Sequence, residues 1–436
     1  MMSLATLRRR LLAREARVAV VGQGYVGLSL ACAAAEAGFP VTGVDVDKPR
    51  VAELAAGELC VPGVDQGAFD RALATGRLRF TSDADGLAGA EVTCICVPTP
   101  LRDHNPDLSY VERACRDVAM HLTAGQLVIL ESTTYPGTTS ELVAPLLEAS
   151  GRQVGVDFQL AYSPERIDPG NSEFHLGNTP RIVGGTTAEA TALAATFYDQ
   201  MIEKVVAVSS SRAAELAKLL ENTFRHVNIA LVNEMAMLCH DMGIDVWEVI
   251  EAAATKPFGF MAFRPGPGVG GHCIPLDPSY LAWQVRRDAG RQFRILEQAQ
   301  DVNAQMPVWV AARIGEALNE HRKSMKGARV LVLGIAYKPD VGDTRESPPL
   351  KVMALLERRG VELSFHDPYV DTIAVNGRRL STTKLTEQAV TKADCVALLT
   401  PHSVYQLDWL AQHASLVFDA RNAFGSDRSH GNVVRL

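Results

Sequence analysis

The chain lacks three features that would assign it to a specialised class of protein. Its eight cysteines form no Cys-x-x-Cys pair and no regular spacing, which argues against a zinc site or a disulfide framework. No uninterrupted apolar run reaches the length of a membrane span. No dense basic run exists beyond Arg8–Arg10 and the net charge is −7, so nothing favours nucleic-acid binding. We therefore expect a reduced, cytoplasmic protein with no membrane, nucleic-acid or metal partner.

The N-terminal residues also lack the apolar core of an export signal. Arg14, Glu15 and Arg17 interrupt the run that begins at Leu11, so we expect no export signal. The basic run Arg8–Arg10 indicates instead that residues 1–15 are a solvated tail. The chain has 436 residues, of which 47% are hydrophobic and 21% charged, as in ordinary globular proteins. This length predicts about two to four domains.

A dinucleotide-binding pattern opens the first domain. The apolar run Arg17–Val21 leads into Gly-x-Gly-x-x-Gly, followed by a helical stretch at Leu28–Ala37 and a second strand at Val41–Val44 that ends at Asp45. Glycines let the turn close and bring a pyrophosphate to the helix N-terminus, while the acid accepts hydrogen bonds from ribose hydroxyls. A carboxylate repels a 2′-phosphate, so we expect NAD rather than NADP. The candidate residues here are Gly22, Gly24, Tyr25, Val26, Gly27 and Asp45.

Strands and helices continue to alternate up to about residue 210. The predicted strands are Glu91–Val97, Leu127–Leu130, Phe158–Tyr162 and Lys204–Val208, and the predicted helices are Leu108–Leu122, Glu141–Ala149 and Ala188–Met201. Thr99 and Thr133 follow the ends of two of these strands. Ligands of parallel sheets lie over the carboxyl ends of strands, so we place both threonines beside the cofactor.

The stretch from Arg212 to Asp241 predicts one long helix, because it has almost no glycine or proline and its apolar residues recur at helical spacing. A polar stripe, Lys218, Asn222, Arg225 and Asn233, runs along another face. This stripe fits either a solvated face or a helix that borders an active site. A second long helix is predicted from about Phe293 to Arg322.

A glycine-rich loop, Gly266–Gly271, lies between these helices and ends near Cys273. Four glycines suit a backbone that needs unusual φ/ψ values or a close approach. Asp277 and Pro278 predict a helix N-cap and first turn just after it, where the helix dipole favours a thiolate. The residues allow two interpretations, an exposed reactive cysteine or a tight turn with an incidental thiol.

The third section repeats the strand and helix alternation from Gly327 onward, without a Gly-x-Gly-x-x-Gly motif. Its first loop, about 335–347, carries Lys338 and Arg345, both suited to a diphosphate. We predict an α/β fold with two doubly wound Rossmann-like domains joined by a central helical region. The expected boundaries are 1–15 for the tail, 16–210 for the NAD-binding domain, 211–324 for the central helical domain and 325–436 for the C-terminal domain.

Six motifs in order make the chain resemble the UDP-glucose/GDP-mannose dehydrogenase family from about residue 16 to its end. They are Gly22–Gly27, Glu131-Ser132-Thr133, Ser163-Pro164-Glu165, Glu215–Lys218 with Asn222, Gly270–Cys273 with Asp277, and Gly342–Ser347. The resemblance implies oxidation of the C6 hydroxyl of a nucleotide sugar to a carboxylate, with NAD used twice. It also implies that the C-terminal domain, 325–436, binds the UDP-sugar.

The resemblance also implies the role of each catalytic residue. Cys273 holds the intermediate aldehyde as a thiohemiacetal and then as a thioester. Thr133 and Asp277 hold the water, and Lys218 with Asn222 stabilises the oxyanion. Glu165 matches an acid/base or water-positioning group.

Further positions are assigned by the same resemblance. The substrate residues are Glu165, Arg166, Lys218, Asn222, Arg225, Arg264, Gly270 and Lys338, and Arg345 joins the cofactor residues. Arg264 stands where a partner subunit's arginine reaches the substrate, and the long helix implies a homodimer.

Two departures from the glucose branch indicate the sugar. Ile274-Pro275-Leu276 replaces a segment that contains lysine there, and the residues after Glu165 are Arg166–Asn171 instead of a segment with a second glutamate. Both resemble the branch acting on UDP-N-acetylhexosamines, first UDP-N-acetylglucosamine, with the galacto and manno epimers as rivals and UDP-glucose as a further alternative. A single-step dehydrogenase and a non-catalytic nucleotide-sugar sensor are the other classes that keep these folds.

Overall fold

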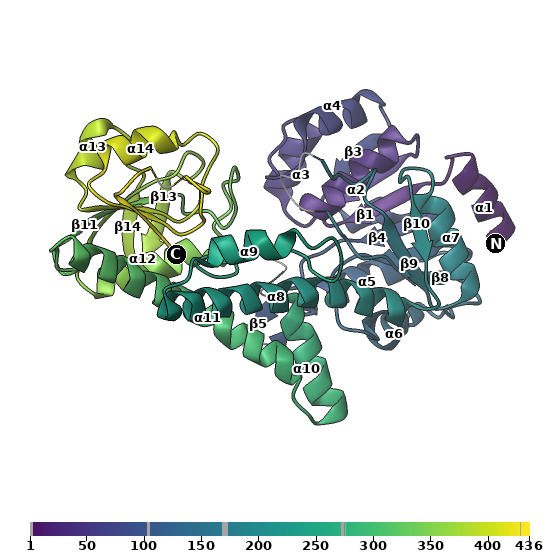
Figure 1. Cartoon of the computed structure of the whole chain (residues 1–436). Coiled ribbons are helices and arrows are strands. Elements are labelled where there is room, and N and C mark those ends of the chain that lie inside the picture. Colours follow the sequence, from purple (N-terminus) through teal and green to yellow (C-terminus); the bar gives the residue numbers. More distant parts are fainter. Residues whose placement is uncertain (1–2, 103–104, 168–172, 272–273, 275, 428) are drawn as a thin grey trace. The chain divides into compact units, whose positions relative to one another are not determined.

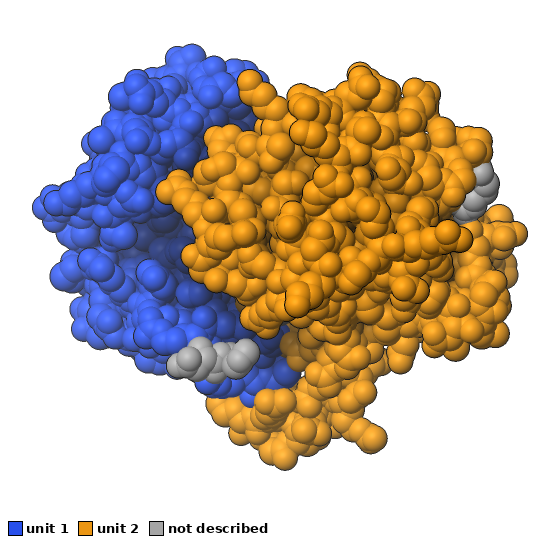
Figure 2. Space-filling model, turned by 90° about the vertical axis from the view of Figure 1, so that its left-hand side faces the viewer, with its two compact units in different colours: residues 1–221, 279–284 blue, residues 222–278, 285–436 orange. Residues whose placement is uncertain are grey.

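The computed structural model describes residues 3–102, 105–167, 173–271, 274, 276–427 and 429–436. The chain forms two compact units, drawn in blue and orange in Figure 2. Unit 1 comprises Met1–Glu221 and Ser279–Gln284, and unit 2 comprises Asn222–Pro278 and Val285–Leu436. The division falls inside one long helix.

The sheet of unit 1 has the strand order β10-β9-β8-β7-β4-β1-β2-β3 (Figure 1). Its strands are β1 (Val18–Val21), β2 (Val41–Val44), β3 (Leu78–Thr81), β4 (Val92–Ile95), β7 (Leu127–Leu130), β8 (Gln159–Tyr162), β9 (Arg181–Gly185) and β10 (Val205–Ala207), and a hairpin of β5 (Leu101–Arg102) and β6 (Asn105–Pro106) lies outside it. The order reverses between β1 and β4, and dinucleotides bind at such a switch point. β9 pairs antiparallel with β8, an addition that the sequence did not predict.

Helices cover both faces of this sheet. They are α1 (Leu4–Leu12), α2 (Tyr25–Glu36), α3 (Lys48–Ala55), α4 (Gln66–Ala74), α5 (Ser109–His121), α6 (Ala144–Glu148) and α7 (Ala188–Tyr198), together with the short turns η1 (Ala84–Leu87) and η2 (Thr139–Val143). Alternate strand residues therefore face two separate apolar clusters, with Val18 and Val20 in one and Ala19 and Val21 in the other.

The expected solvated tail is wrong for most of residues 1–15. Residues Leu4–Leu12 form α1, whose Leu7 and Leu11 are fully buried in the core of unit 1. The Arg10 Nε–H donates to Glu91 Oε1 at 2.6 Å, whereas Arg8 and Arg9 are exposed. In the sequence, two leucines four residues apart are a weak helical signal, and the three arginines between Leu7 and Leu11 conceal it.

Four helices follow the first sheet, namely α8 (Ser211–Met242), α9 (Val246–Ala254), α10 (Asp277–Ala289) and α11 (Arg294–Glu320). The predicted long helix is confirmed as α8, and most of its polar stripe is buried whereas much of its apolar stripe is exposed. The polar residues Lys218, Asn222 and Asn233 are 8%, 7% and 0% exposed. The apolar residues Leu220 and Leu231 are 64% and 56% exposed.

The sheet of unit 2 has the order β12-β11-β15-β16-β17, with every pair parallel. Its strands are β11 (Arg329–Leu333), β12 (Glu362–His366), β15 (Cys395–Leu398), β16 (Val417–Asp419) and β17 (Val433–Arg435), with a hairpin of β13 (Thr372–Val375) and β14 (Arg378–Ser381) beside it. Helix α12 (Pro348–Arg358) packs with one apolar cluster, and α13 (Glu387–Lys392) with α14 (Leu407–His413) packs with another. This second doubly wound fold, predicted from the sequence, has its switch point between β11 and β15.

Within the described part of the chain, none of the helices combines the length and the apolar character that crossing a membrane requires.

Candidate functional site

The first glycine motif closes the turn between β1 and α2 in the way that its sequence predicts. Gly22 has a φ of +91°, and a Cβ there would lie 2.8 Å from the carbonyl oxygen of Cys96. A Cβ at Gly27 would collide with the carbonyl oxygen of Gly22, so both positions require glycine. The space beside Gly24 is open, because nothing lies within 4 Å of a Cβ built there.

The residues around this turn fit a dinucleotide. Helix α2 begins at Tyr25 with Gly24 as N-cap and no side-chain cap, and a helix N-terminus of this kind suits a pyrophosphate. Asp45 is 8% exposed, and its Oδ2 accepts the Gln23 N–H at 2.6 Å. Arg50 Nη1 donates to the same oxygen at 3.1 Å. The acid is therefore held against the glycine turn, as a ribose-binding carboxylate must be.

Thr99 and Thr133 are brought together by hydrogen bonds of the loops that follow β4 and β7. The Thr99 hydroxyl donates to the carbonyl oxygen of Thr133 at 2.8 Å. The hydroxyl of Tyr280, on α10, donates to the carbonyl oxygen of Thr99 at 2.6 Å. These bonds join both loops at the carboxyl edge of the sheet, where the sequence placed them.

Glu165 is held by three donors on the loop after β8. Its Oε1 accepts the N–H groups of Arg166 and Ile167, each at 2.6 Å, and its Oε2 accepts from Arg181 Nη1 at 2.8 Å. A carboxylate with these partners anchors a loop more readily than it transfers a proton. The neighbouring Arg166 donates to Glu221 Oε2 at 3.2 Å and to the carbonyl oxygen of Pro180 at 2.5 Å. The residues 168–171, which complete the predicted sugar-recognition segment, lie outside the described residues.

Arg181, on β9, is a residue that the sequence analysis missed. Its side chain is 3% exposed and pairs with Glu131 as well as with Glu165. Its Nε–H donates to Ser163 Oγ at 2.8 Å, and its guanidinium lies 4.8 Å from the ring centre of Tyr198. Glu131 begins the loop that carries Thr133, so one buried cation connects both candidate catalytic loops. Burial raises the pKa of Glu131 even though Arg181 opposes this effect.

Glu215 ties α8 to the loop after β7. Its carboxylate accepts the N–H groups of Gly137 and Thr139 at 2.6 and 2.8 Å, and the hydroxyl of Thr139 at 2.6 Å. Burial raises the pKa of Glu215 despite these hydrogen bonds. The anchor fixes the helix at a point one turn before Lys218. Among the residues that the structure describes, none forms an ion pair with the buried Lys218.

Asn222 and Asp277 meet within unit 2. The side-chain amide of Asn222 donates to Asp277 Oδ2, and the two side chains are 7% and 4% exposed. Asp277 is the first residue of α10 rather than its N-cap, which is Leu276, so that part of the prediction is wrong. Its Oδ2 accepts from Asn222 on α8. Cys273, the predicted nucleophile, lies outside the described residues.

The glycine loop is packed too closely for side chains. A Cβ on Gly270 would lie 2.7 Å from Pro348 Cδ and 2.8 Å from Tyr337 Cβ. Gly271 has a φ of +89°, and its N–H donates to the carbonyl oxygen of Arg345 at 3.2 Å. The loop therefore lies directly against residues 337–348 of the C-terminal domain.

A chain of buried amides supports the start of this loop. Asn233 Oδ1 accepts the Gly266 N–H at 3.0 Å, and the Asn233 amide donates to Asn303 Oδ1 at 2.9 Å. Asn303 in turn donates to the carbonyl oxygen of His226 at 3.2 Å. Of the polar stripe of α8, Lys218, Asn222 and Asn233 are thus buried, whereas Arg225 is exposed, and Asn233 holds the glycine loop.

Two of the arginines predicted to bind cofactor or substrate form ion pairs with acidic side chains. Arg345 Nη2 donates to Asp343 Oδ2 at 2.6 Å, and Arg264 Nη2 pairs with Glu251 Oε1 at 2.8 Å. Both ion pairs are exposed, with the Arg345 and Arg264 side chains 64% and 59% accessible. Arg225 is exposed on α8, and Lys338 lies in the loop after β11.

Three domain models of one family match the chain in order. The UDP-glucose/GDP-mannose dehydrogenase NAD binding domain matches residues 16–202, the central domain 212–305 and the UDP binding domain 331–426.

Individual relatives cover nearly all of the chain. It is 37% identical over 413 residues to the UDP-N-acetyl-D-mannosamine dehydrogenase of Pyrococcus horikoshii, with 93% of this chain and 95% of the relative covered. It is also 37% identical over 360 residues to the UDP-N-acetyl-D-glucosamine 6-dehydrogenase of Pseudomonas aeruginosa, covering 82% and 84%. The solved structure of a UDP-D-ManNAc dehydrogenase from Pyrococcus horikoshii superposes with a TM-score of 0.87 at 36% identity, over 96% of this chain and 98% of that one.

Proposed function

The chain belongs to the UDP-glucose/GDP-mannose dehydrogenase family and is an NAD-dependent UDP-sugar dehydrogenase, and we propose that it oxidises the C6 hydroxyl of a UDP-N-acetylhexosamine to a carboxylate through a covalent intermediate on Cys273. One observation carries the proposal. Lys218 and Asn222 lie one turn apart on α8, both buried, and Asn222 donates to the carboxylate of Asp277. An ammonium, an amide and a water-binding carboxylate are the groups that the chemistry requires together.

The reaction consists of two oxidations and one hydrolysis. NAD, held at Gly22–Gly27 and Asp45, would supply the hydride acceptor for each oxidation, with two NAD used per sugar. In the first oxidation C6 also loses its hydroxyl proton to a water held by Thr133 and Asp277. The Cys273 thiolate then adds to the aldehyde, and loss of the second hydride leaves a thioester. Water attacks this carbonyl, the C–S bond breaks, and the acid and the free thiol are released.

Lys218 and Asn222 act where negative charge develops on the C6 oxygen. A buried ammonium stabilises an oxyanion more strongly than a solvated one does, because the local dielectric is low. The Asp277 carboxylate accepts from Asn222, which fixes the amide so that its remaining N–H is available. Two buried thiols of the chain, Cys115 and Cys395, are unsuited to the nucleophile's role that the proposal gives to Cys273. Burial raises the pKa of Cys115 and of Cys395 to about 12, and a protonated thiol is a poor nucleophile.

The name of the mannosamine relative favours the manno epimer over the gluco epimer that the sequence departures suggested. UDP-N-acetylmannosamine is therefore the first candidate substrate. UDP-N-acetylglucosamine is the second, supported by the Pseudomonas aeruginosa relative.

A homodimer through α8 is part of the proposal. Leu220, Phe224 and Leu231 are 64%, 48% and 56% exposed on one helix, an apolar surface of the kind that marks an interface. Light scattering on the full chain is expected to show a dimer. Leu220→Glu should shift it toward monomer, and Leu12→Glu, also at an exposed leucine, should not. A stable, fully active wild-type monomer at assay concentration would reject the dimer.

The test of the function is NADH release from a panel of UDP-sugars. We expect at least about tenfold higher kcat/KM for an N-acetylhexosamine than for UDP-glucose, as the loss of one polar pairing implies. Cys273→Ser should lose nearly all acid production while NAD and UDP still bind. Substantial turnover to the uronic acid by that variant would remove Cys273 as the nucleophile, and a preference for UDP-glucose would reject the substrate assignment.

A further inference from the structure

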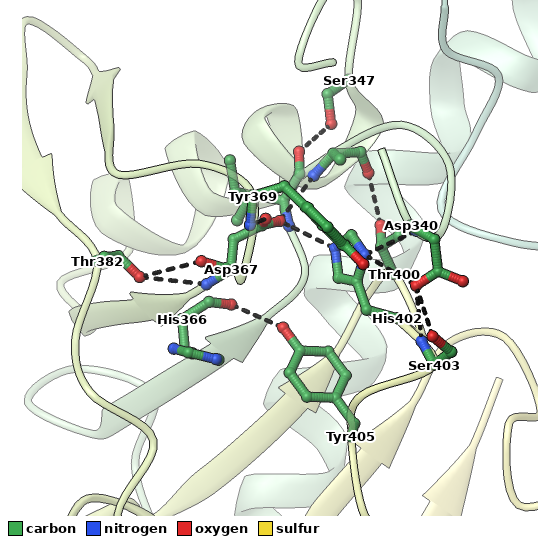
Figure 3. Close-up of polar contacts among 12 residues, drawn as sticks. Asp340, Ser347, His366, Asp367, Tyr369, Thr382, Thr400, His402, Ser403 and Tyr405 are labelled. Carbon is green, nitrogen blue, oxygen red and sulfur yellow. Dashed lines mark hydrogen bonds and ion pairs between the residues drawn. The ribbon is translucent and has the colours of Figure 1, made fainter. Parts of the chain in front are cut away.

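Three loops meet at the carboxyl edge of the sheet in unit 2, around a buried pair formed by Asp367 and His402 (Figure 3). Asp367 follows β12, His402 follows β15, and residues 334–347 follow β11, the strand that lies between them in the sheet. Both side chains are fully buried, and His402 Nε2 lies 3.0 Å from Asp367 Oδ2.

Asp367 holds the start of the loop that follows β11. Its Oδ2 also accepts the N–H groups of Ile335 and Ala336, at 2.8 and 3.3 Å. Its Oδ1 accepts the Tyr369 N–H at 2.9 Å. Although burial alone would raise the pKa of Asp367, the hydrogen bonds from His402 and the backbone bring it below its usual value, so the carboxylate is ionised.

The hydrogen bonds of His402 determine its tautomer. The Asp340 N–H donates to His402 Nδ1 at 2.9 Å, so Nδ1 accepts and carries no proton. The ring proton therefore lies on Nε2 and is donated to Asp367. His402 acts as a bridge from the fixed carboxylate to the middle of the loop, two residues after Lys338.

Side chains at both ends reinforce this arrangement. The Thr400 and Ser347 hydroxyls donate to the carbonyl oxygens of Ala336 and Ile335, each at 2.6 Å. The N–H and the hydroxyl of Ser403 donate to Asp340 Oδ1 at 2.8 and 3.0 Å. Of these contacts at Asp340, the one to His402 is the one that a second ring proton would remove, because Nδ1 would then carry a hydrogen and could no longer accept.

We infer that His402 is a positioning residue for UDP-sugar binding, which holds the loop of residues 335–347 only while its ring is neutral. A second ring proton would occupy Nδ1 and displace the Asp340 N–H. The groups that face the ring are the carboxylates of Asp367 and Asp340, the latter 3.9 Å from Nδ1, and the rings of Tyr369 and Tyr405 at 5.1 and 5.6 Å. Once Nδ1 carries a proton, its favoured partner is the Asp340 carboxylate instead of the Asp340 N–H. This change of partner releases the contacts of the carboxylate with Ser403 and moves the loop.

The inference rests on the proposed function in one respect, because it assigns the loop to the nucleotide part of a UDP-sugar. The chain's match to a UDP binding domain over residues 331–426 supports that assignment.

The experiment compares two replacements of His402 in the full chain. His402→Gln keeps one donor and one acceptor at similar spacing but does not titrate. His402→Phe keeps a ring but leaves the Asp340 N–H without an acceptor. His413→Gln is the control, because His413 lies on α14 of the same domain, with Nδ1 at the carbonyl oxygen of Trp409 in its own helix and Nε2 4.0 Å from Glu387 Oε2. UDP itself is the probe, with its Kd measured by calorimetry between about pH 8 and pH 6.

For the wild type and for His413→Gln, we expect the Kd for UDP to rise as the pH falls. For His402→Gln it should match the wild type near pH 8 and rise much less on acidification. His402→Phe should weaken UDP binding about tenfold at every pH, as loss of a buried hydrogen bond implies. In turnover, KM for the UDP-sugar should follow Kd, whereas kcat and the KM for NAD should change less than about twofold.

Each remaining result decides the question. If His402→Gln keeps the full acid-dependent rise, another group titrates and the inference is overturned, and this holds even if His402→Phe does not fold. Unchanged UDP binding by folded His402→Phe would also overturn it, as would a wild type that does not bind UDP. If the wild type binds UDP yet oxidises none of the sugars, the proposed function fails while the calorimetric comparison still tests His402.

Discussion

Arg181 provides the most demanding test of how the candidate catalytic loops are held. Its side chain is 3% exposed and neutralises two carboxylates, Glu131 and Glu165. Arg181→Met keeps similar length and apolar volume but removes the charge, which leaves two buried carboxylates without their counter-ion. Removing one partner of a buried ion pair costs about 3–5 kcal/mol. For a unit of this size each kcal/mol lowers the melting temperature by about 2–4 °C, so we expect a loss of about 6–20 °C.

The loss should depend on pH with a definite sign. Without Arg181 the burial of Glu131 raises its pKa further above the unfolded value of about 4.3. Between those two values the folded variant binds a proton that the unfolded chain does not, so its stability falls as the pH rises. The melting temperature of Arg181→Met should therefore lie further below the wild type at about pH 7.5 than at about pH 5.

The assay is differential scanning calorimetry, with Arg116→Met as the matched control. Arg116 is 61% exposed and pairs with Glu112 along one helix face, where such pairs contribute about 0.3–0.5 kcal/mol. The double variant Glu131→Gln/Arg181→Met should recover part of the loss, because it removes an uncompensated charge. If Arg181→Met melts within about 2 °C of the Arg116→Met control at pH 7.5, the reasoning is refuted.

Three further expectations follow from the same structure. Burial lowers the pKa of His226 to about 4, below the unfolded value of about 6.5. Its contribution to stability is therefore present above about pH 6.5 and is lost as the pH falls toward 4. Calorimetry should show that His226→Leu loses about 3 kcal/mol less stability than the wild type over that range, and equal losses would contradict this. Gly270→Ala would press its Cβ against Pro348 and Tyr337, so kcat/KM for the UDP-sugar should fall at least about tenfold. The control Gly431→Ala has open space around its Cβ and should leave kcat/KM unchanged. Equal kcat/KM for the two variants would rule out the close approach. Asp45→Asn should reduce the preference for NAD over NADP by at least about tenfold in kcat/KM, and an unchanged ratio, or a wild type that uses both equally, would reject Asp45 as the discriminating acid.

The local patterns in the sequence were sufficient for most of the fold. The turn from β1 through Gly22–Gly27 to Asp45 was predicted because its residue types meet requirements of the nearby backbone. Gly22 and Gly27 allow the close approach of other backbone atoms, and Asp45 accepts the Gln23 N–H. Strand β7 was predicted at its observed bounds, and α8 within one residue at each end. Hydrophobic periodicity and the residues that end helices and strands are properties of short segments, so they can be recognised from the sequence alone. The second doubly wound domain followed from the same alternation.

Other features were decided only when distant segments packed together. No local signal distinguishes Arg181 on a short strand, and its role comes from two loops that reach it across the sheet. The sequence showed two stripes on α8 but not which stripe is covered, because burial depends on what packs against the helix. Likewise, the apolar spacing of Leu7 and Leu11 becomes a docked helix only when a core is present to receive it.

The pairing of Asp367 with His402 shows the same limit most clearly. Three loops separated by more than thirty residues, as in the Ile335–Asp367 and Asp367–His402 bonds, meet because β12, β11 and β15 are neighbours in the sheet. The sequence determined that a nucleotide-binding fold would form there and which cations its first loop would carry. The tertiary structure alone decided which buried side chains hold that loop, since a hydrogen bond between such segments is set by strand order and not by sequence distance.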